Sequence, residues 1–158
     1  IPGAMGSSSF DNEGVRTAAR DLLKDGVLQG YLLSTYSARK LGMRTTGNAG
    51  GSHNLLLRSR LTQADDDLNA LLKKMHRGLL VTELIGQGVN YVTGDYSRGA
   101  FGYWVDNGEI QYPVEEITIA GNLKEMFKQI QAVANDRITR GSKTSGSVLI
   151  EQMAVAGS

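Results

Sequence analysis

The sequence contains no cysteine and only two prolines among its 158 residues. Without cysteine, the chain can form no disulfide, no thiolate zinc site and no cysteine nucleophile. No run approaches the ~20 consecutive apolar residues that a membrane helix needs, and no signal-peptide core is visible. The net charge is only +1, so the charge does not indicate binding to nucleic acid or to an anionic membrane. The absence of cysteine is compatible with a cytoplasmic protein.

Glycine, by contrast, is abundant, with 20 residues, and 41% of the chain is hydrophobic. A chain of this length and apolar content fits one domain with a real core. Much glycine with little proline favours tight turns and hairpins over disorder, because glycine readily adopts positive φ. Residues 1–7 resemble a remnant of cloning. We therefore expect a domain at residues 8–158, cut from a longer chain.

The apolar pattern predicts three helices, at residues 34–41, 64–76 and 122–135. Thr62 and Asp65 resemble a capping box at the start of the second helix, and Gly78 would end it. Asn122 would cap the third helix. The second and third helices are the main ones.

About seven or eight strands are expected from ten candidate segments joined by short turns, so antiparallel pairing should dominate. Asp25-Gly26 is a strong two-residue hairpin signal, and residues 106–108 form a second turn. Residues 45–52 and 137–144 have the composition of loops. The candidate strands are residues 22–24, 27–33, 53–58, 79–85, 89–93, 100–105, 109–112, 114–119, 147–150 and 153–155. The fold class is therefore α+β and β-rich.

The inventory of catalytic residue types is poor. The two histidines are 23 residues apart, His76 near the end of a predicted helix and His53 after a glycine-rich loop. His53 either has a functional role or is an ordinary satisfied or exposed side chain. No metal-ligand spacing such as His-Glu-x-x-His occurs, and the nucleophile-elbow pattern Gly-x-Ser-x-Gly is missing. Neither a metal site nor serine catalysis is expected from this chain alone.

Two glycine-rich stretches are the remaining candidates for a functional site. Residues 47–51 lack the Gly-Lys-Ser/Thr end of a phosphate loop, so they form either a tight connection or a loop whose amides contact a ligand. Residues 93–104 interleave glycines with four aromatic residues, Asp95 and Arg98. They form either a hairpin with an aromatic core face or a surface to which an extended peptide adds as a strand. Asp95 and Arg98 could pair locally or bind the termini of a peptide.

Several colinear motifs resemble the PmbA (TldE) branch of the TldD/PmbA family. The strongest are Glu83-Leu84-Ile85-Gly86-Gln87-Gly88-Val89-Asn90, Thr93-Gly94-Asp95-Tyr96-Ser97-Arg98-Gly99 and Gly102-Tyr103-Trp104-Val105-Asp106-Asn107-Gly108-Glu109-Ile110. The resemblance runs from about residue 10 to residue 157. It implies the C-terminal domain of a two-subunit cytoplasmic peptidase, also labelled a modulator of DNA gyrase, with a barrel-like sheet carrying the helices.

The resemblance implies that the TldD-like subunit of this family binds zinc through a helix with the motif His-Glu-x-x-x-His. It also implies that the PmbA-like subunit lacks this motif. A late cysteine that helps to hold zinc in the TldD-like branch has no counterpart here at about residues 144–146. We therefore expect no catalytic residue, metal ligand or cofactor in this chain, and zinc in its partner. The expected partners are a TldD-like subunit and peptide substrates.

Three functions remain in view. The first is a subunit domain that forms the interface and chamber wall of the peptidase. The second is an independent hydrolase using His53, Asp95 or Ser97, and the third is a module that binds or regulates DNA gyrase or another protein. The charge balance does not favour DNA binding. The residues expected to contact a peptide or partner are Asn48, Gly50, His53, Gly94, Asp95, Tyr96, Ser97, Arg98 and Gly99.

Overall fold

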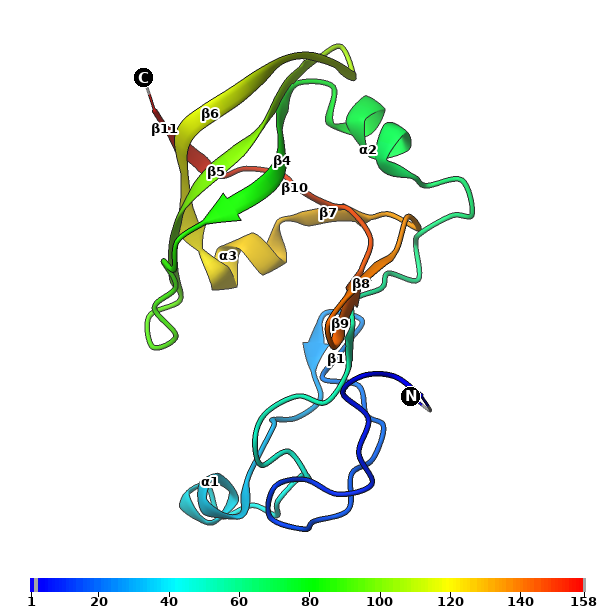
Figure 1. Ribbon diagram of the computed structural model, residues 1–158, viewed down its shortest axis with the longest axis vertical. Coiled ribbons are helices and arrows are strands. Elements are labelled where there is room, and N and C mark those ends of the chain that lie inside the picture. The colour runs from blue at the N-terminus through cyan, green and yellow to red at the C-terminus, as the bar shows by residue number, and fades with distance from the viewer. Residues whose placement is uncertain (2, 158) are drawn as a thin grey trace. The chain divides into compact units, whose positions relative to one another are not determined.

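The computed structural model describes residue 1 and residues 3–157, which divide into two compact units. The first unit contains Ile1–Leu56 and Thr139–Thr144, and the second contains Leu57–Ile138 and Ser145–Ser158. Figure 1 shows that loops make up most of the first unit, whereas long strands dominate the second.

The first unit begins with the predicted hairpin of β1 (Leu23–Lys24) and β2 (Val27–Leu28), in which Leu23 pairs with Leu28. Asp25 and Gly26 both have positive φ, 53° and 78°, as a two-residue type I′ turn requires. The second strand stops at Leu28 and does not extend to residue 33 as expected.

Helix α1 (Thr35–Lys40) confirms the first predicted helix. Ser34 caps it through a complete capping box with Ser37, and Glu13 Oε2 accepts the Thr35 amide at 2.8 Å. β3 (Leu55–Leu56), β9 (Lys143–Ser145) and β8 (Ile138–Arg140) form a three-stranded sheet in that order. The prediction of a loop at residues 137–144 was therefore wrong, and β3 is much shorter than the predicted strand at residues 53–58.

β3 and β9 pair in parallel, with Leu55 opposite Lys143. This pairing joins segments almost 90 residues apart, and no local turn signal announces such a contact.

The second unit is built on a four-stranded antiparallel sheet ordered β11-β6-β5-β4. Its strands are β4 (Gly78–Ile85), β5 (Asp95–Asp106), β6 (Glu109–Asn122) and β11 (Ala154–Ala156). The predicted turn at residues 106–108 joins β5 to β6, with φ of 54° at Asn107 and 76° at Gly108. Pro113 has no amide hydrogen to donate, but it lies outside residues 118–120, the only part of β6 that pairs with β11. β6 can therefore continue through Pro113 as one long strand.

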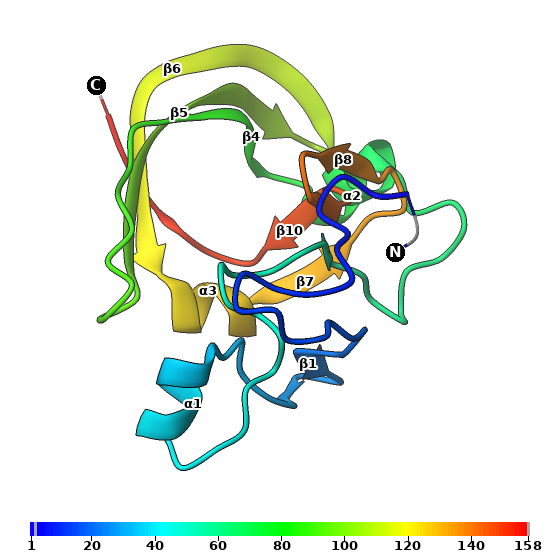
Figure 2. The same cartoon turned by 60° about the horizontal axis from the view of Figure 1, so that its bottom comes forward.

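Three shifts of register bend this sheet. Two lie between β5 and β6, near Ala100 and Gly102 and near Trp104 and Val105, and the third lies in β4 between Val81 and Glu83. Glu116 in β6 also adopts a positive φ of 55°. A Cβ at Gly102 would lie 1.9 Å from the Leu80 carbonyl oxygen, so the close approach of β4 requires glycine there. Figure 2 shows the resulting curl of β4, β5 and β6, with β7 (Ile130–Val133) and β10 (Val148–Ile150) lying across its open side.

The core of this unit lies against that curled sheet. Ala100, Ile117 and Ile119 are buried together and are packed by partly buried apolar side chains: Leu79, Val81, Tyr96, Val114 and Met153. Val105 is fully buried. Each of these side chains transfers apolar surface out of water, which is the main stabilising contribution to the sheet.

Helices α2 (Leu68–Met75) and α3 (Leu123–Lys128) are shorter than predicted. α2 begins after Asp67, whose side chain accepts the Ala70 amide, because the Thr62 hydroxyl instead donates to the Val133 carbonyl at 2.6 Å. α3 is capped by Asn122 as predicted, but it ends at Lys128 because the next residues form β7, antiparallel to β10.

The expected fold class is confirmed: the protein is α+β and strand-rich, with mostly antiparallel sheets and helices beside them. The barrel-like sheet of the expectation does not close into a barrel. Many large apolar side chains are exposed in both units, including Leu23, Val27 and Leu28 on the first hairpin.

Candidate functional site

The glycine loop of the first unit is a packed connection rather than a free one. A Cβ at Gly47 would lie 2.5 Å from the Arg16 carbonyl oxygen, and one at Gly50 would lie 2.4 Å from Asn12 Nδ2. Both glycines have positive φ, 67° and 96°. At both positions glycine is therefore needed for two reasons: its positive φ and the close approach of residues 12–16.

Asp11 holds the two loops together. Its Oδ1 accepts the amides of Glu13 and Val15 and its Oδ2 accepts the Ala49 amide, each at 2.9 Å. Burial of the carboxyl raises its pKa, but these three backbone hydrogen bonds and the nearby His53 outweigh burial and leave the pKa below its ordinary value. Asp11 is therefore a buried anion that organises the loop, a role that its sequence position did not reveal.

Two of the predicted contact residues, Asn48 and His53, lie in this loop. His53 Nε2 is 3.2 Å from the Gly47 carbonyl oxygen, so this nitrogen carries the proton in that hydrogen bond. Asn48 Nδ2 donates to the Gly51 carbonyl at 3.3 Å. Asn48 Oδ1 is buried and finds no donor within residues 1 and 3–157. This oxygen is a spare acceptor beside the exposed Gly50.

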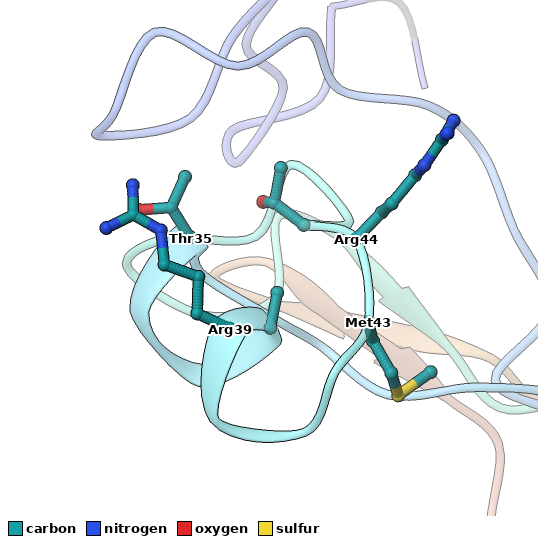
Figure 3. Close-up of a pocket in the computed structure, with 6 residues that line it drawn as sticks. Thr35, Arg39, Met43 and Arg44 are labelled. Carbon is teal, nitrogen blue, oxygen red and sulfur yellow. The ribbon is translucent and has the colours of Figure 1, made fainter.

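A shallow hollow of about 370 Å³ lies beside α1 and is lined by Thr35, Ala38, Arg39, Met43, Arg44 and Thr45. Figure 3 shows Arg39 and Arg44 reaching to opposite sides of it. The two cations do not converge on one point, so the hollow has no fixed position for an anion.

On the second unit, Asp95 is tied into its own loop. Its Oδ2 accepts the Thr93 hydroxyl at 2.7 Å, and its Oδ1 accepts from Asn122 Nδ2 at 3.2 Å. The hydrogen bond from Thr93 and then that from Asn122 lower the pKa of Asp95, against a smaller opposing effect of burial. Asp95 is thus an ionised structural anchor.

Arg98 lies on the opposite face of β5 from Asp95, because side chains three apart on a strand alternate. The two side chains do not pair, so the local ion pair considered from the sequence is absent. Arg98 Nε and Nη2 donate to the carbonyls of Ile85 and Leu84 over long distances of 3.4 Å. Much of its hydrogen-bonding capacity stays available at the β4 edge of the sheet.

Ser97 and Gly88 fasten the β4–β5 loop to the sheet. The Ser97 amide donates to the Gly88 carbonyl at 2.7 Å, and a Cβ at Gly88 would lie 1.5 Å from the Ser97 carbonyl oxygen. Tyr96 forms an isolated bridge with Val89 and helps to pack the core, while Gly94 and Gly99 are at the start and in the middle of this run. The predicted strand at residues 89–93 was wrong, because this segment is the loop itself.

Sequence reasoning missed Tyr91 and Val92, which it assigned to that strand. Their side chains are 90% and 95% exposed at the tip of the loop. Asn90, whose Oδ1 accepts the amides of Val92 and Thr93, gave the available signal, because an asparagine side chain hydrogen-bonds the backbone two residues on and so favours a turn. The predicted contact residues thus form two groups, residues 48–53 in one unit and residues 94–99 in the other.

The described residues gather no group of three histidine, aspartate or glutamate side chains that could hold a metal ion. The carboxylate oxygens of Asp11 and Asp95 already accept hydrogen bonds from nearby loops, and His53 Nε2 already donates to a carbonyl. These donors do not fit a resident zinc ion. Within the same residues, no helix is long and apolar enough to span a membrane.

Comparison with known proteins decides the family. The family described as "PmbA/TldA metallopeptidase C-terminal domain" matches residues 1–157. This chain belongs to that family. The resemblance found in the sequence motifs is thereby confirmed.

Individual relatives of the domain agree with this membership. Metalloprotease PmbA of Escherichia coli O157:H7 is 56% identical over 153 residues, 97% of this chain and 33% of that protein. A Metalloprotease TldD homolog of Haemophilus influenzae is 30% identical over 142 residues, 85% of this chain and 30% of that protein. A crystal structure from Thermotoga maritima MSB8, described as a modulator of a DNA gyrase, has a TM-score of 0.87 and 40% identity, covering 99% of this chain and 37% of that chain. This chain therefore spans about a third of the length of its relatives.

Proposed function

We propose that this chain is the C-terminal domain of the subunit that does not hold the metal in a TldD/TldE-type zinc peptidase, and that it works in the cytoplasm. The main support for this proposal is a difference in sequence identity: 56% to a PmbA protein but 30% to a TldD homolog. That gap favours the PmbA branch. The metal is then the partner's, in keeping with a donor set that does not fit zinc.

In this proposal the domain contributes contacts and the TldD-like subunit contributes bond cleavage. The substrates are peptides and unfolded segments. β4 has a neighbour on one side only, so an extended chain could add to its outer edge by backbone hydrogen bonds. Arg98 reaches the carbonyls of that strand and would meet a carboxylate of the added chain.

The proposed contact residues differ in what they offer. Asn48 has a spare buried oxygen, and Gly50 is exposed beside it. His53 and Asp95 act by holding their loops. The residues proposed to contact a peptide or partner form one group in each unit: Asn48, Gly50 and His53 in the first, and Gly94, Asp95, Tyr96, Ser97, Arg98 and Gly99 in the second.

The test combines a protein of full family length that carries this domain with a purified TldD-like subunit. The proposal expects one stable complex in size-exclusion chromatography and peptide hydrolysis only when both subunits are present. Arg98→Ala should raise KM for peptides with a free carboxylate, whereas Arg39→Ala, in α1, serves as the matched control and should leave KM unchanged. Two subunits that never associate, with the TldD-like subunit fully active alone, would contradict the proposal.

A second candidate is a module that binds DNA gyrase, favoured by the description of the Thermotoga maritima relative. Pull-down of purified gyrase subunits by the full-length protein tests it directly. The subunit proposal expects no retention of gyrase under conditions that retain the TldD-like subunit.

A further inference from the structure

The turn at Asn107-Gly108, which joins β5 to β6, contains the only asparagine–glycine pair in the sequence. In such a pair the glycine amide nitrogen can attack the asparagine side-chain amide, because glycine has no Cβ to obstruct the approach. The fold uses the same two residues as a two-residue turn of type I′, with φ of 54° and 76°. The residues that suit this turn are therefore also the pair of this chain most prone to that reaction.

The end of helix α2 holds the attacking group of this pair. The Gly108 amide donates to the His76 carbonyl at 2.8 Å, so the proton that must leave before the attack is engaged in a hydrogen bond. A Cβ at Gly108 would lie 2.9 Å from Lys73 Cα, so the turn lies directly against the backbone of α2. While α2 stays in place, the Gly108 nitrogen is hindered both from losing its proton and from swinging towards the Asn107 side chain.

His76, which supplies the carbonyl, is itself held in a strained conformation. Its φ of 62° and ψ of −57° lie outside the regions that residues other than glycine normally occupy. Such a conformation persists only where its surroundings impose it. Because this strain is released when the contact opens, the end of α2 separates from the turn more readily than an unstrained helix end would.

We propose that Asn107 is a deamidation site guarded by α2, and that the reaction occurs when the end of α2 separates from the turn. The Gly108 nitrogen loses its proton and forms a bond to Asn107 Cγ, while the bond from Cγ to Nδ2 breaks and Nδ2 leaves as ammonia. Water then opens the resulting succinimide ring at either of its carbonyls and leaves aspartate or isoaspartate at this position. No reactant other than water is needed.

The isoaspartate product makes the separation permanent. It places an additional carbon in the main chain of the turn, so the pairing of Asp106 with Glu109 and the hydrogen bond from Gly108 to His76 no longer fit together. Both products also add a negative charge between Asp106 and Glu109, and like charges this close repel each other. The turn thereby converts a transient opening of α2 into a lasting change at one end of the sheet.

The experiment follows deamidation in the full-length protein that carries this domain, at mildly alkaline pH. Mass spectrometry of the tryptic peptide 99–124 reports a gain of one mass unit, and its fragment ions separate Asn107 from Asn122. Asp67→Ala removes the side chain that caps α2, so α2 should open more often. Deamidation at Asn107 should then be about 5-fold faster than in the wild type, as the usual loss of an N-cap implies.

Asn122→Ala is the matched control, because it removes the cap of α3 at the opposite end of β6 from the turn. Its rate of deamidation at Asn107 should equal that of the wild type. Melting curves check that the two cap variants lose similar stability. Asn107→Gln keeps a side-chain amide but requires a larger ring, so its peptide should show no gain of mass at this position.

The outcomes are distinct. Faster deamidation in Asp67→Ala, with an unchanged rate in Asn122→Ala, supports the guard. Equal acceleration in both cap variants would show that global unfolding exposes the pair, which refutes a guard formed by α2. A wild-type rate equal to that of the urea-unfolded protein would show that the fold gives no protection. If Asp67→Ala forms no product in the time in which the unfolded protein reacts, the proposal is overturned as well.

Discussion

Asn122 and Asp95 face each other at one end of the curled sheet, where Asn122 Nδ2 donates to Asp95 Oδ1 at 3.2 Å. The same nitrogen donates to the Thr93 carbonyl, and Asn122 Oδ1 accepts the Lys124 amide at 3.1 Å. One side chain therefore caps α3 and hydrogen-bonds to the start of β5 and to the end of the β4–β5 loop.

Asn122→Ala should reduce the free energy of unfolding by about 1–2 kcal/mol, because it removes a helix cap and two further hydrogen bonds. Urea unfolding followed by circular dichroism measures the change. Asn122→Ser is the matched control: serine still caps the helix but is too short to donate to both Asp95 and Thr93. An equal loss in both variants would show that donation matters more than capping, and no loss in either would contradict the role assigned to Asn122.

The ionisation of Asp95 should respond to Thr93. The Thr93 hydroxyl is the main cause of the lowered pKa of Asp95. Thr93→Val removes that donor while keeping the shape, so the pKa of Asp95 should rise towards its ordinary value of 3.8. NMR titration of the side-chain carboxyl carbon gives the pKa in both proteins. An unchanged pKa would mean that the hydroxyl does not serve the carboxylate in solution.

The first unit should lose stability in acid through Asp11. The pKa of Asp11 is lowered in the folded chain. Its stabilising effect is therefore fully present above its ordinary pKa and disappears as pH falls through the lower folded value. The protection factors of the Ala49, Val15 and Glu13 amides against hydrogen exchange should fall together as the pH is lowered through that range.

Asp11→Asn should abolish the acid-dependent part of this change and speed exchange at neutral pH, since an amide oxygen cannot accept all three hydrogen bonds. Exchange rates that do not differ between the variant and the wild type would contradict the role of Asp11.

Gly88→Ala should disrupt the packing of the β4–β5 loop against β5. The new Cβ would meet the Ser97 carbonyl oxygen at 1.5 Å, so the backbone must move and the free energy of unfolding should fall by about 2–3 kcal/mol. Gly30→Ala is the control, because a Cβ there meets nothing within 4 Å and the change should stay within about 0.5 kcal/mol. Equal stability of the two variants, measured by denaturant unfolding, would refute the close packing described at Gly88.

The elements that the sequence predicted well depend on local signals. The hairpin at Asp25-Gly26, the Asn107-Gly108 turn and the Ser34 cap all act within a few residues, and all three were found. The family resemblance likewise rested on contiguous motifs and was confirmed.

The errors arose where distant segments compete. Residues 130–133 continue the helical pattern of α3, yet Ile130 and Val133 pair with Ile150 and Val148 in a sheet that the periodicity cannot reveal. The parallel pairing of β3 with β9 was invisible for the same reason.

Two structural features were also missed from the sequence. Asp11 is an ordinary-looking aspartate until three backbone amides converge on it. Tyr91 and Val92 read as strand residues, but the Asn90 side chain binds the amides of Val92 and Thr93 and favours a turn over pairing.

The central claim is that this domain belongs to the subunit without the metal, and zinc analysis of the separated subunits tests it most directly. After purification of the assembled peptidase, each subunit is isolated and its zinc content is measured by plasma mass spectrometry. The account predicts about one zinc per TldD-like subunit and none above background in the subunit carrying this domain. Stoichiometric zinc retained by the latter would contradict the account.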